Sequence, residues 1–193
     1  MKSLLIENST ESGSLAVAEA GGVLIRREFS KAGQLSLAVQ EVFLELGAPD
    51  EIVVGIGPGS YTGLRVAAAT AIGLQLALRC PAYGCPSVLG YEETSYHVVG
   101  DARLGSVFLA GIEGRRLVRG PELLPIEEFQ SLLPALRAKP IFSIGPVPGC
   151  TYLPVLRPRA EYLIGCRESF RSVLEPIYLK EPHITLARKN HAV

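Results

Sequence analysis

The sequence predicts a mixed α/β fold of two lobes that opens with elements in the order β-β-β-α-β-α. A short apolar run at residues 52–56 ends at Gly57-Pro58-Gly59, which is typical of a buried strand followed by a sharp turn. Hairpin signals precede this strand, and a similar hairpin pattern restarts near Asp101. We therefore expect a larger lobe at 1–100 and a smaller, shortened lobe at 101–193.

The first lobe begins with three predicted strands at residues 4–6, 14–18 and 23–29. A polar turn at 7–13 separates the first two, and Gly21-Gly22 indicates a hairpin between the second and third. The predicted helix at 34–46 has one apolar stripe facing the sheet. It also has surplus apolar residues toward a second side: Leu37, Phe43 and Leu44.

The predicted helix after the glycine turn contains no charged residue between Val66 and Leu78. A helix on a sheet usually shows charge to water on its outer face, so we expect both faces of this helix to be covered. Ala69, Gly73 and Ala77 form a stripe of small residues suited to close packing, although plain helix propensity would also explain it. Ser60 or Thr62 is the expected N-cap. The turn residues assigned a structural role are Gly57, Pro58, Gly59, Ser60, Thr62 and Gly63.

Further strands are predicted at residues 81–84, 96–99 and 106–112, near 117–118, and at 141–144. A helix is expected at 126–136, which Pro134 could interrupt, and another at 159–170. An apolar hook follows at 176–179, and the sequence from Glu181 onward is polar and expected to fray.

Composition describes a globular protein of 193 residues with 48% hydrophobic residues and no net charge. Neutrality argues against a generally basic nucleic-acid surface and favours association. The N-terminal apolar run is short for a signal peptide and no stretch suits a membrane span, so we expect a cytoplasmic protein. Cys80 and Cys85 could form a redox pair, but reduced thiols are the simpler interpretation.

Four segments resemble one family in the order that family has them. Residues 57–65, GPGSYTGLR, resemble the GPGSFTGLR signature of bacterial TsaB proteins, also called YeaZ. Residues 4–17 look like the first two strands of that family, 101–108 its DAR-hydrophobic-GEVY segment, and 176–180 its terminal P-hydrophobic-YLR. The family's first strand usually ends in aspartate where Glu7 stands, and a histidine often stands near the position of Lys31.

The resemblance implies an actin-like ATPase, or ribonuclease-H-like, fold of two lobes. It also implies a role in forming threonylcarbamoyladenosine at position 37 of tRNAs that read ANN codons. In that family the chain is a degenerate, non-catalytic partner of TsaD, and the ATPase TsaE joins the complex. The resemblance further implies a homodimer when the chain is alone, no cofactor in the isolated chain, and indirect or weak contact with tRNA.

The chemical motifs of an independent enzyme are incomplete. The glycine turn lacks the lysine of a phosphate-binding Walker loop and the third glycine of a dinucleotide motif. His97, His183 and His191 lack the His-x-x-x-His spacing of a TsaD-like metal site. Glu7 and Glu11 could act as paired carboxylates, although surface or capping roles are simpler. We therefore expect no catalytic, cofactor or metal residue. The alternative is a stand-alone nucleotide-dependent phosphotransferase or hydrolase of the actin-like fold.

Other polar residues are candidates for binding. Arg65 stands in the first helical turn, where positive charge is mildly unfavourable, so it could have a carboxylate or phosphate partner. Small basic clusters could contact tRNA phosphates, although solvated surface arginines are the simpler interpretation; they are Arg115, Arg116 and Arg119, and Arg157 and Arg159. The predicted partner interface consists of Leu37, Gln40, Glu41, Leu44, Tyr61, Arg65, Ala69, Gly73 and Leu76.

Overall fold

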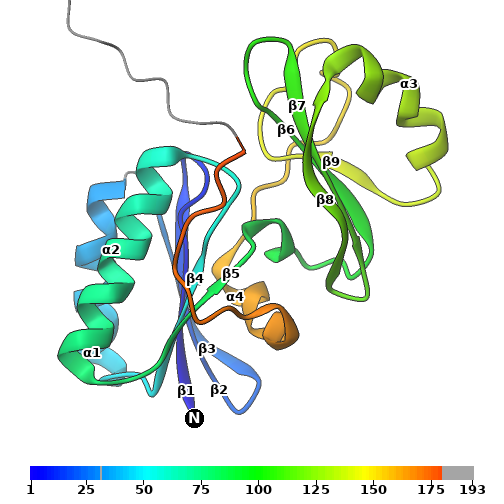
Figure 1. The fold of residues 1–193 in the computed structure, drawn as a ribbon. Helices are drawn as coiled ribbons and strands as arrows, with labels where there is room; N and C mark the ends of the chain where they lie inside the picture. Colours follow the sequence, from blue (N-terminus) through cyan, green and yellow to red (C-terminus); the bar gives the residue numbers. More distant parts are fainter. Residues whose placement is uncertain (31, 180–193) are drawn as a thin grey trace, which may run out of the picture.

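Two β-sheets and their covering helices are stacked in layers in the computed structural model, which describes residues 1–30 and 32–179 (Figure 1). The expectations for Lys31 and for the polar residues from Glu181 onward fall outside this part of the chain. Within it, none of the helices combines the length and apolar character that crossing a membrane requires.

The first sheet has the strand order β3-β2-β1-β4-β5. β1 pairs antiparallel with β2, and β2 with β3, whereas β4 is parallel to β1 and to β5. Side chains alternate between its faces: Ile52 and Val54 belong to one core cluster and Val53 to another. The prediction of a strand buried on both faces is therefore confirmed. The strands are β1 (Lys2–Glu7), β2 (Gly13–Glu19), β3 (Gly22–Phe29), β4 (Glu51–Gly55) and β5 (Ala82–Cys85).

The second sheet repeats the pairing of the first four strands, in the order β8-β7-β6-β9. Its two hairpin pairs are antiparallel and β9 is parallel to β6. β8 is longer than the sequence indicated and passes through Pro121. The strands are β6 (Tyr96–Asp101), β7 (Ser106–Glu113), β8 (Arg116–Pro125) and β9 (Ile141–Ser143).

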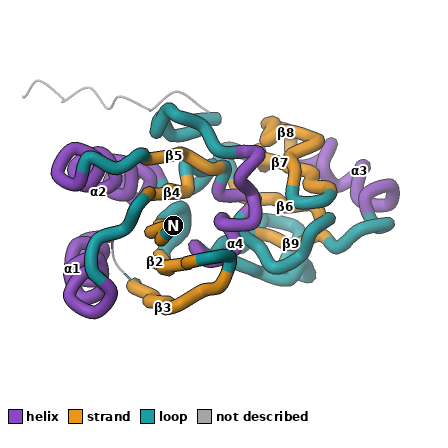
Figure 2. The backbone as a smooth tube through the Cα atoms, turned by 90° about the horizontal axis from the view of Figure 1, so that it is seen from below, coloured by secondary structure: helices purple, strands orange, loops and turns teal. Residues whose placement is uncertain are grey.

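Five layers are visible from below the molecule (Figure 2). α1 (Leu35–Leu46) and α2 (Tyr61–Leu78) cover the outer face of the first sheet. Its inner face meets α4 (Ala160–Leu163) and side chains of the second sheet in a shared core. α3 (Ile126–Leu136) covers the far face of the second sheet. Short 3-10 helices join these elements: η1 (Ala32–Gln34), η2 (Ser87–Leu89) and η3 (Ile164–Ser169).

The C-terminal part of the described chain returns to the first lobe. α4 packs against β1, β2 and β4. Residues 170–179, which we call the strap, then run beside the first sheet, shown in orange to red in Figure 1. β6, which begins at Tyr96, already belongs to the second sheet, so a boundary at residue 100 would pass through that strand. The division into 1–100 and 101–193 stays a prediction.

One predicted helix is wrong in extent. Residues 159–170 do not form a continuous α-helix: α4 ends at Leu163 and η3 follows, with non-helical backbone angles at Cys166 (φ −111°, ψ 29°). Glu51, at the beginning of β4, is buried. Its carboxylate forms an ion pair with Arg167 of η3 and accepts a hydrogen bond from the hydroxyl of Ser3 on β1. Satisfying this buried charge ties η3 to β4 and β1.

Candidate protein-docking surface

An apolar groove of about 550 Å³ runs between the outer sides of α1 and α2. Both helices begin near the carboxyl ends of the strands and lie side by side on the same face of the sheet (Figures 1 and 2). The groove is lined by Ser36, Val39, Gln40, Phe43, Leu44, Ala69, Thr70, Gly73 and Leu74.

α1 has two apolar sides because its leucines exceed what one sheet contact can bury. Leu35, Ala38, Val39 and Val42 are buried against the first sheet. On the other side Leu44 is 82% exposed, and Leu37 is also exposed. A side chain of this kind loses about 1.5–3 kcal/mol of favourable burial while it stays in water.

α2 faces the sheet with small residues and water with larger ones. Ala67, Ala68 and Ala71 are buried, whereas Leu76 is 74% exposed and Ile72 is also exposed. A Cβ added at Gly73 would meet nothing within 4 Å, so this position opens outward into the groove. The expectation that both faces are covered therefore requires a second molecule.

The glycine turn fixes where α2 begins. Ser60 is the N-cap, because its Oγ accepts a hydrogen bond from the Gly63 N–H at 3.3 Å, which confirms one of the two predicted caps. Gly59 and Gly63 allow the loop after β1 to approach closely: an added Cβ would lie 2.2 Å from Ser9 O and 2.0 Å from Asn8 O, respectively. The Ser9 carbonyl oxygen also accepts a hydrogen bond from the Ser60 N–H at 2.6 Å, so this amide of the turn is already occupied within the chain.

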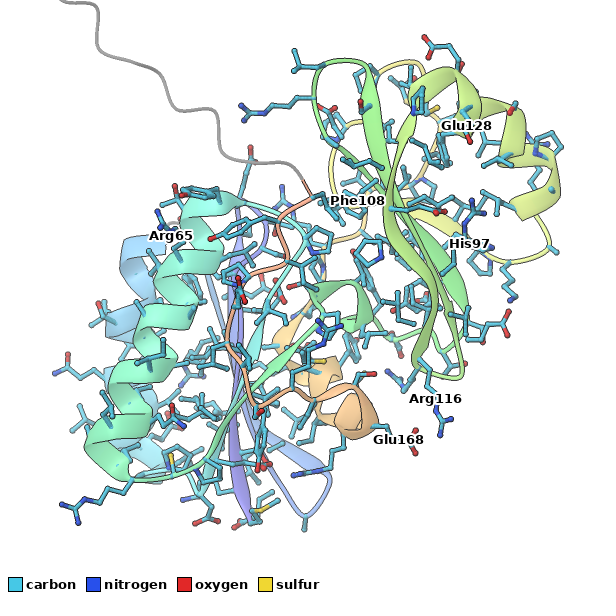
Figure 3. All side chains as sticks on the ribbon, viewed as in Figure 1. Arg65, His97, Phe108, Arg116, Glu128 and Glu168 are labelled. Atoms are coloured by element: carbon cyan, nitrogen blue, oxygen red, sulfur yellow. The ribbon has the colours of Figure 1, made fainter. Side chains whose placement is uncertain are left out.

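Three side chains form a stack at the N-terminal end of α2. The Arg65 guanidinium carbon lies 4.7 Å from the centroid of the Tyr61 ring, and the Tyr61 and Tyr178 centroids are 5.4 Å apart. Figure 3 shows Arg65 directed away from the sheet at this end of the helix. Among the described residues no carboxylate forms an ion pair with Arg65, and its neighbour is the Tyr61 ring instead.

The Glu7 carboxyl is buried, so the surface role is wrong for this residue, whereas a capping role agrees with its contact to the following turn. Its Oε1 accepts a hydrogen bond from the Ser9 N–H at 2.7 Å, while its Oε2 is buried and accepts no hydrogen bond from the residues that the structure describes. An added Cβ at Gly55 would lie 1.8 Å from Oε2, so the carboxyl fills the space that this glycine leaves. Burial raises the pKa of Glu7 above its ordinary value.

Glu7 and Glu11 do not form a carboxylate pair. Glu11 is exposed, and one of its oxygens lies 3.8 Å from the guanidinium of Arg157. The two acidic groups therefore stand in different surroundings, one in the core and one in water.

The basic clusters have partners within the chain, so they are not free cationic patches. Arg115 donates to the carbonyl oxygens of Tyr91 and Glu92, at 3.1 and 2.8 Å. Arg116 pairs with Glu168 beneath the junction of the two lobes, where Figure 3 labels both residues. The other three also form ion pairs with carboxylates: Arg119, Arg157 and Arg159.

The cysteine pair suggested by the sequence is wrong. Cys80 and Cys85 contribute to core clusters on opposite faces of the first sheet. Cys85 instead lies near Cys166, and this neighbour raises the pKa of Cys85 and lowers that of Cys166. The Cys85 thiol donates to the carbonyl oxygen of Pro86 at 3.9 Å, and the Cys166 thiol to that of Leu89 at 3.7 Å. All four thiols are free and buried.

The predicted interface residues fall into three places on the same two helices. Gln40, Leu44, Ala69 and Gly73 line the groove. Leu37, Glu41 and Leu76 are exposed on α1 and α2 outside that lining, and Tyr61 and Arg65 belong to the stack.

Sequence reasoning left several groove residues outside the predicted interface. Phe43 was recognised as surplus apolar surface but was not assigned to the interface, and its spacing of three residues from Gln40 could have found it. Tyr178 carries no such signal, because its contact with Tyr61 joins residues far apart in sequence.

The fold and the surface together define a two-lobed α/β protein of the actin-like class with an exposed apolar helix pair. A family model for TsaD, tRNA N6-adenosine threonylcarbamoyltransferase, matches residues 6–111. That is more than half of the 193 residues, and the chain belongs to this family.

Two solved structures share the fold over almost the whole chain. YeaZ from Pseudomonas aeruginosa is 24% identical, with a TM-score of 0.68, over 92% of this chain and 99% of that one. A protein with similarity to peptidase YeaZ from the same organism is 23% identical, with a TM-score of 0.68, over 93% of this chain and 99% of its own. The actin-like fold and the resemblance to TsaB, or YeaZ, are confirmed.

A curated relative is the uncharacterized protein ML0378 of Mycobacterium leprae, which is 38% identical over 88 residues. The alignment covers 44% of this chain and 24% of that protein, so the match spans about a quarter of the relative's length.

Proposed function

We propose that this chain is a non-catalytic scaffold subunit that binds and activates a TsaD homologue in the formation of threonylcarbamoyladenosine at position 37 of tRNAs reading ANN codons. The observation that carries the proposal is the open apolar groove between α1 and α2. A contiguous exposed patch of this kind on a folded chain usually marks a protein interface.

Family membership supports the choice of partner. The matched residues 6–111 include all of α1 and α2, so we expect a TsaD homologue to carry equivalent helices. Two related surfaces with the same apolar helix pair can bury each other, as the identical surfaces of a two-fold dimer do. The same argument favours a homodimer when the TsaD homologue is absent.

The packing of Glu7 supports a non-catalytic role. An acidic ligand of a metal or nucleotide must present its carboxylate to open space, whereas Glu7 Oε2 lies against Gly55 in the core. The alternative, a stand-alone nucleotide-dependent phosphotransferase or hydrolase with Glu7 as a ligand, would need the Glu7 carboxylate to move out of the core.

The remaining partners follow from the same proposal. A TsaE homologue joins the complex, and contact between this chain and tRNA is indirect or weak, because the arginine clusters are engaged with this chain's own acidic groups and carbonyl oxygens. The reaction takes place in the cytoplasm.

A reconstitution with the homologues of the same organism tests the proposal. Purified alone with ATP, magnesium and tRNA, the chain should neither hydrolyse ATP nor modify the tRNA. With the TsaD and TsaE homologues and a threonylcarbamoyl donor, modification should appear and should depend on this chain. ATP turnover by the lone chain that disappears in Glu7→Ala would support the enzyme alternative. Equal tRNA modification with and without the chain would refute the scaffold role.

A further inference from the structure

The strap, residues 170–179, crosses the glycine turn and reaches the beginning of α2. Near its beginning, a pair of backbone hydrogen bonds, each 2.8 Å long, joins Arg171 to Gly84 on β5. Farther along, the Ile177 N–H donates to Ile56 O at 2.7 Å, and the Ile177 side chain packs against the core under α1 and α2. These contacts fix the strap at two places: at Gly84 on β5, and at Ile56, the residue that precedes the glycine turn.

The residue after Ile177 leaves the core and joins the exposed stack. The rings of Tyr61 and Tyr178 are each 42% exposed although they pack on each other. Because Ile177 is anchored by its backbone and its side chain, Tyr178 is held beside Tyr61 from a separate part of the chain. The strap therefore restricts the ring that supports the guanidinium of Arg65.

We infer that the strap belongs to the docking surface, with Tyr178 as a positioning residue for Tyr61 and Arg65 and as a contact residue for the partner. The inference rests on the proposed function, because it takes the partner to be the TsaD homologue. It extends the surface from the apolar groove to the N-terminal end of α2 and assigns to it a segment more than a hundred residues away in the chain.

The chemistry of the stack specifies what the partner places there. Tyrosine and arginine are among the side chains enriched at residues that dominate binding energy, and a preordered stack loses little conformational freedom on binding. With one face on Tyr61, the guanidinium still has N–H donors along its edge. The first turn of α2 contains no acidic residue that could use them. A carboxylate of the partner satisfies this end of the surface.

Three strap variants test the role of Tyr178 by titration against the purified TsaD homologue. Tyr178→Ala should weaken binding by about tenfold or more, because it removes a contact and frees Tyr61. Tyr178→Phe keeps the ring and should bind within about twofold of wild type. Val173→Ala is the matched control, since Val173 is also exposed on the strap but lies outside the stack. Thermal unfolding should show that all three remain folded.

The outcomes separate this inference from the proposed function. Wild-type affinity of Tyr178→Ala, together with loss of binding by Gly73→Glu in the groove, would overturn the role of the strap and leave the docking surface in place. Wild-type affinity of Gly73→Glu would refute the groove as the interface.

A salt titration tests the partner carboxylate that we place at Arg65. Binding of wild type should weaken with added salt more steeply than binding of Arg65→Gln, and equal salt dependence would overturn that contact.

Discussion

The two halves of the molecule contain the same unit with different outer surfaces. β1-β2-β3-α1-β4 and β6-β7-β8-α3-β9 share one pairing scheme, with two antiparallel hairpin pairs and a parallel fourth strand reached through a helix. In each unit that helix covers one face of its sheet. Because α1 and α3 occupy the same place in the two units, a difference between their outer surfaces comes from the sequences of the helices.

α3 buries its apolar residues on one side and presents polar residues on the other. Phe129, Leu133 and Leu136 face the second sheet. Glu127 and Glu128 lie in the first turn of α3, where the helix dipole favours negative charge. Glu128 is exposed to solvent. α1 buries a similar stripe but leaves Leu37 and Leu44 in water, and α2 lies beside it with Leu76 exposed. The outer side of the helix is closed by polar residues in the second half and left open, with exposed apolar residues, in the first.

The largest expected effect comes from truncating a buried side chain on the side of α3 that faces its sheet. Phe129 is fully buried, so Phe129→Ala should lower the free energy of unfolding by about 3–5 kcal/mol. Leu44→Ala on the open helix should change it by less than about 0.5 kcal/mol, because that side chain is exposed in the free chain. Urea unfolding of both variants measures the difference. A comparable loss in the two would show that Leu44 is already covered and would remove the contrast between the halves.

A charge placed on each outer surface should distinguish the halves by binding. Gly73→Glu puts a carboxylate in the groove, where a Cβ meets nothing within 4 Å, and glutamate is a better helix former than glycine. The variant should stay folded but bind the TsaD homologue about a hundredfold more weakly, since the charge must lose water without a partner.

Ala135→Glu is the matched control for that experiment, because Ala135 is exposed on α3. It should bind the TsaD homologue like wild type. Light scattering should also show that Gly73→Glu is monomeric under conditions in which wild type and Ala135→Glu self-associate. Equal weakening by both substitutions would mean that the open face of α1 and α2 is not the interface.

The local signals in the sequence were sufficient for most elements but not for contacts between distant segments. Apolar alternation and turn residues located β1 to β7, and Ser60 was one of the two expected caps, because capping depends on neighbouring residues. The helix at 159–170 was overpredicted: η3 is tied to β4 by the ion pair between Arg167 and the buried Glu51, a contact between remote segments that local signals do not contain.

The candidate site divides in the same way. Surplus leucines on α1 and the charge-free α2 predicted an exposed apolar pair, since helical periodicity places residues on a face. The pairing of the arginines and the packing of Tyr178 on Tyr61 could not be predicted, because each depends on how the second half and the strap return to the first sheet.

Glu7 and Asp101 occupy the same place in the two units and differ in burial. Each ends the first strand of its unit and accepts a hydrogen bond from the backbone N–H two residues later: Ser9 at 2.7 Å and Arg103 at 2.8 Å. Asp101 is exposed, whereas Glu7 lies against Gly55 in the core. The shared hydrogen bond serves the turn in both units, so the burial of Glu7 is an additional feature of the open half.

The smallest expected effect is a dependence of stability on pH that originates at Glu7. Burial raises its pKa in the folded chain, so the folded state holds the proton more tightly than the unfolded state does. The contribution of Glu7 to the free energy of unfolding is complete below the pKa that it has in the unfolded chain. That contribution is lost as pH rises through the pKa of the folded chain, with a slope of at most about 1.4 kcal/mol per pH unit. Glu7→Gln keeps the shape without a charge, so the variant should gain stability over wild type as pH rises through that range. Urea midpoints measured across the acidic to neutral range, with Asp101→Asn as the matched carboxylate removal in the other unit, check this. Parallel pH curves for wild type and Glu7→Gln would show that Glu7 has the same proton affinity in both states and that its burial is not reflected in its ionisation.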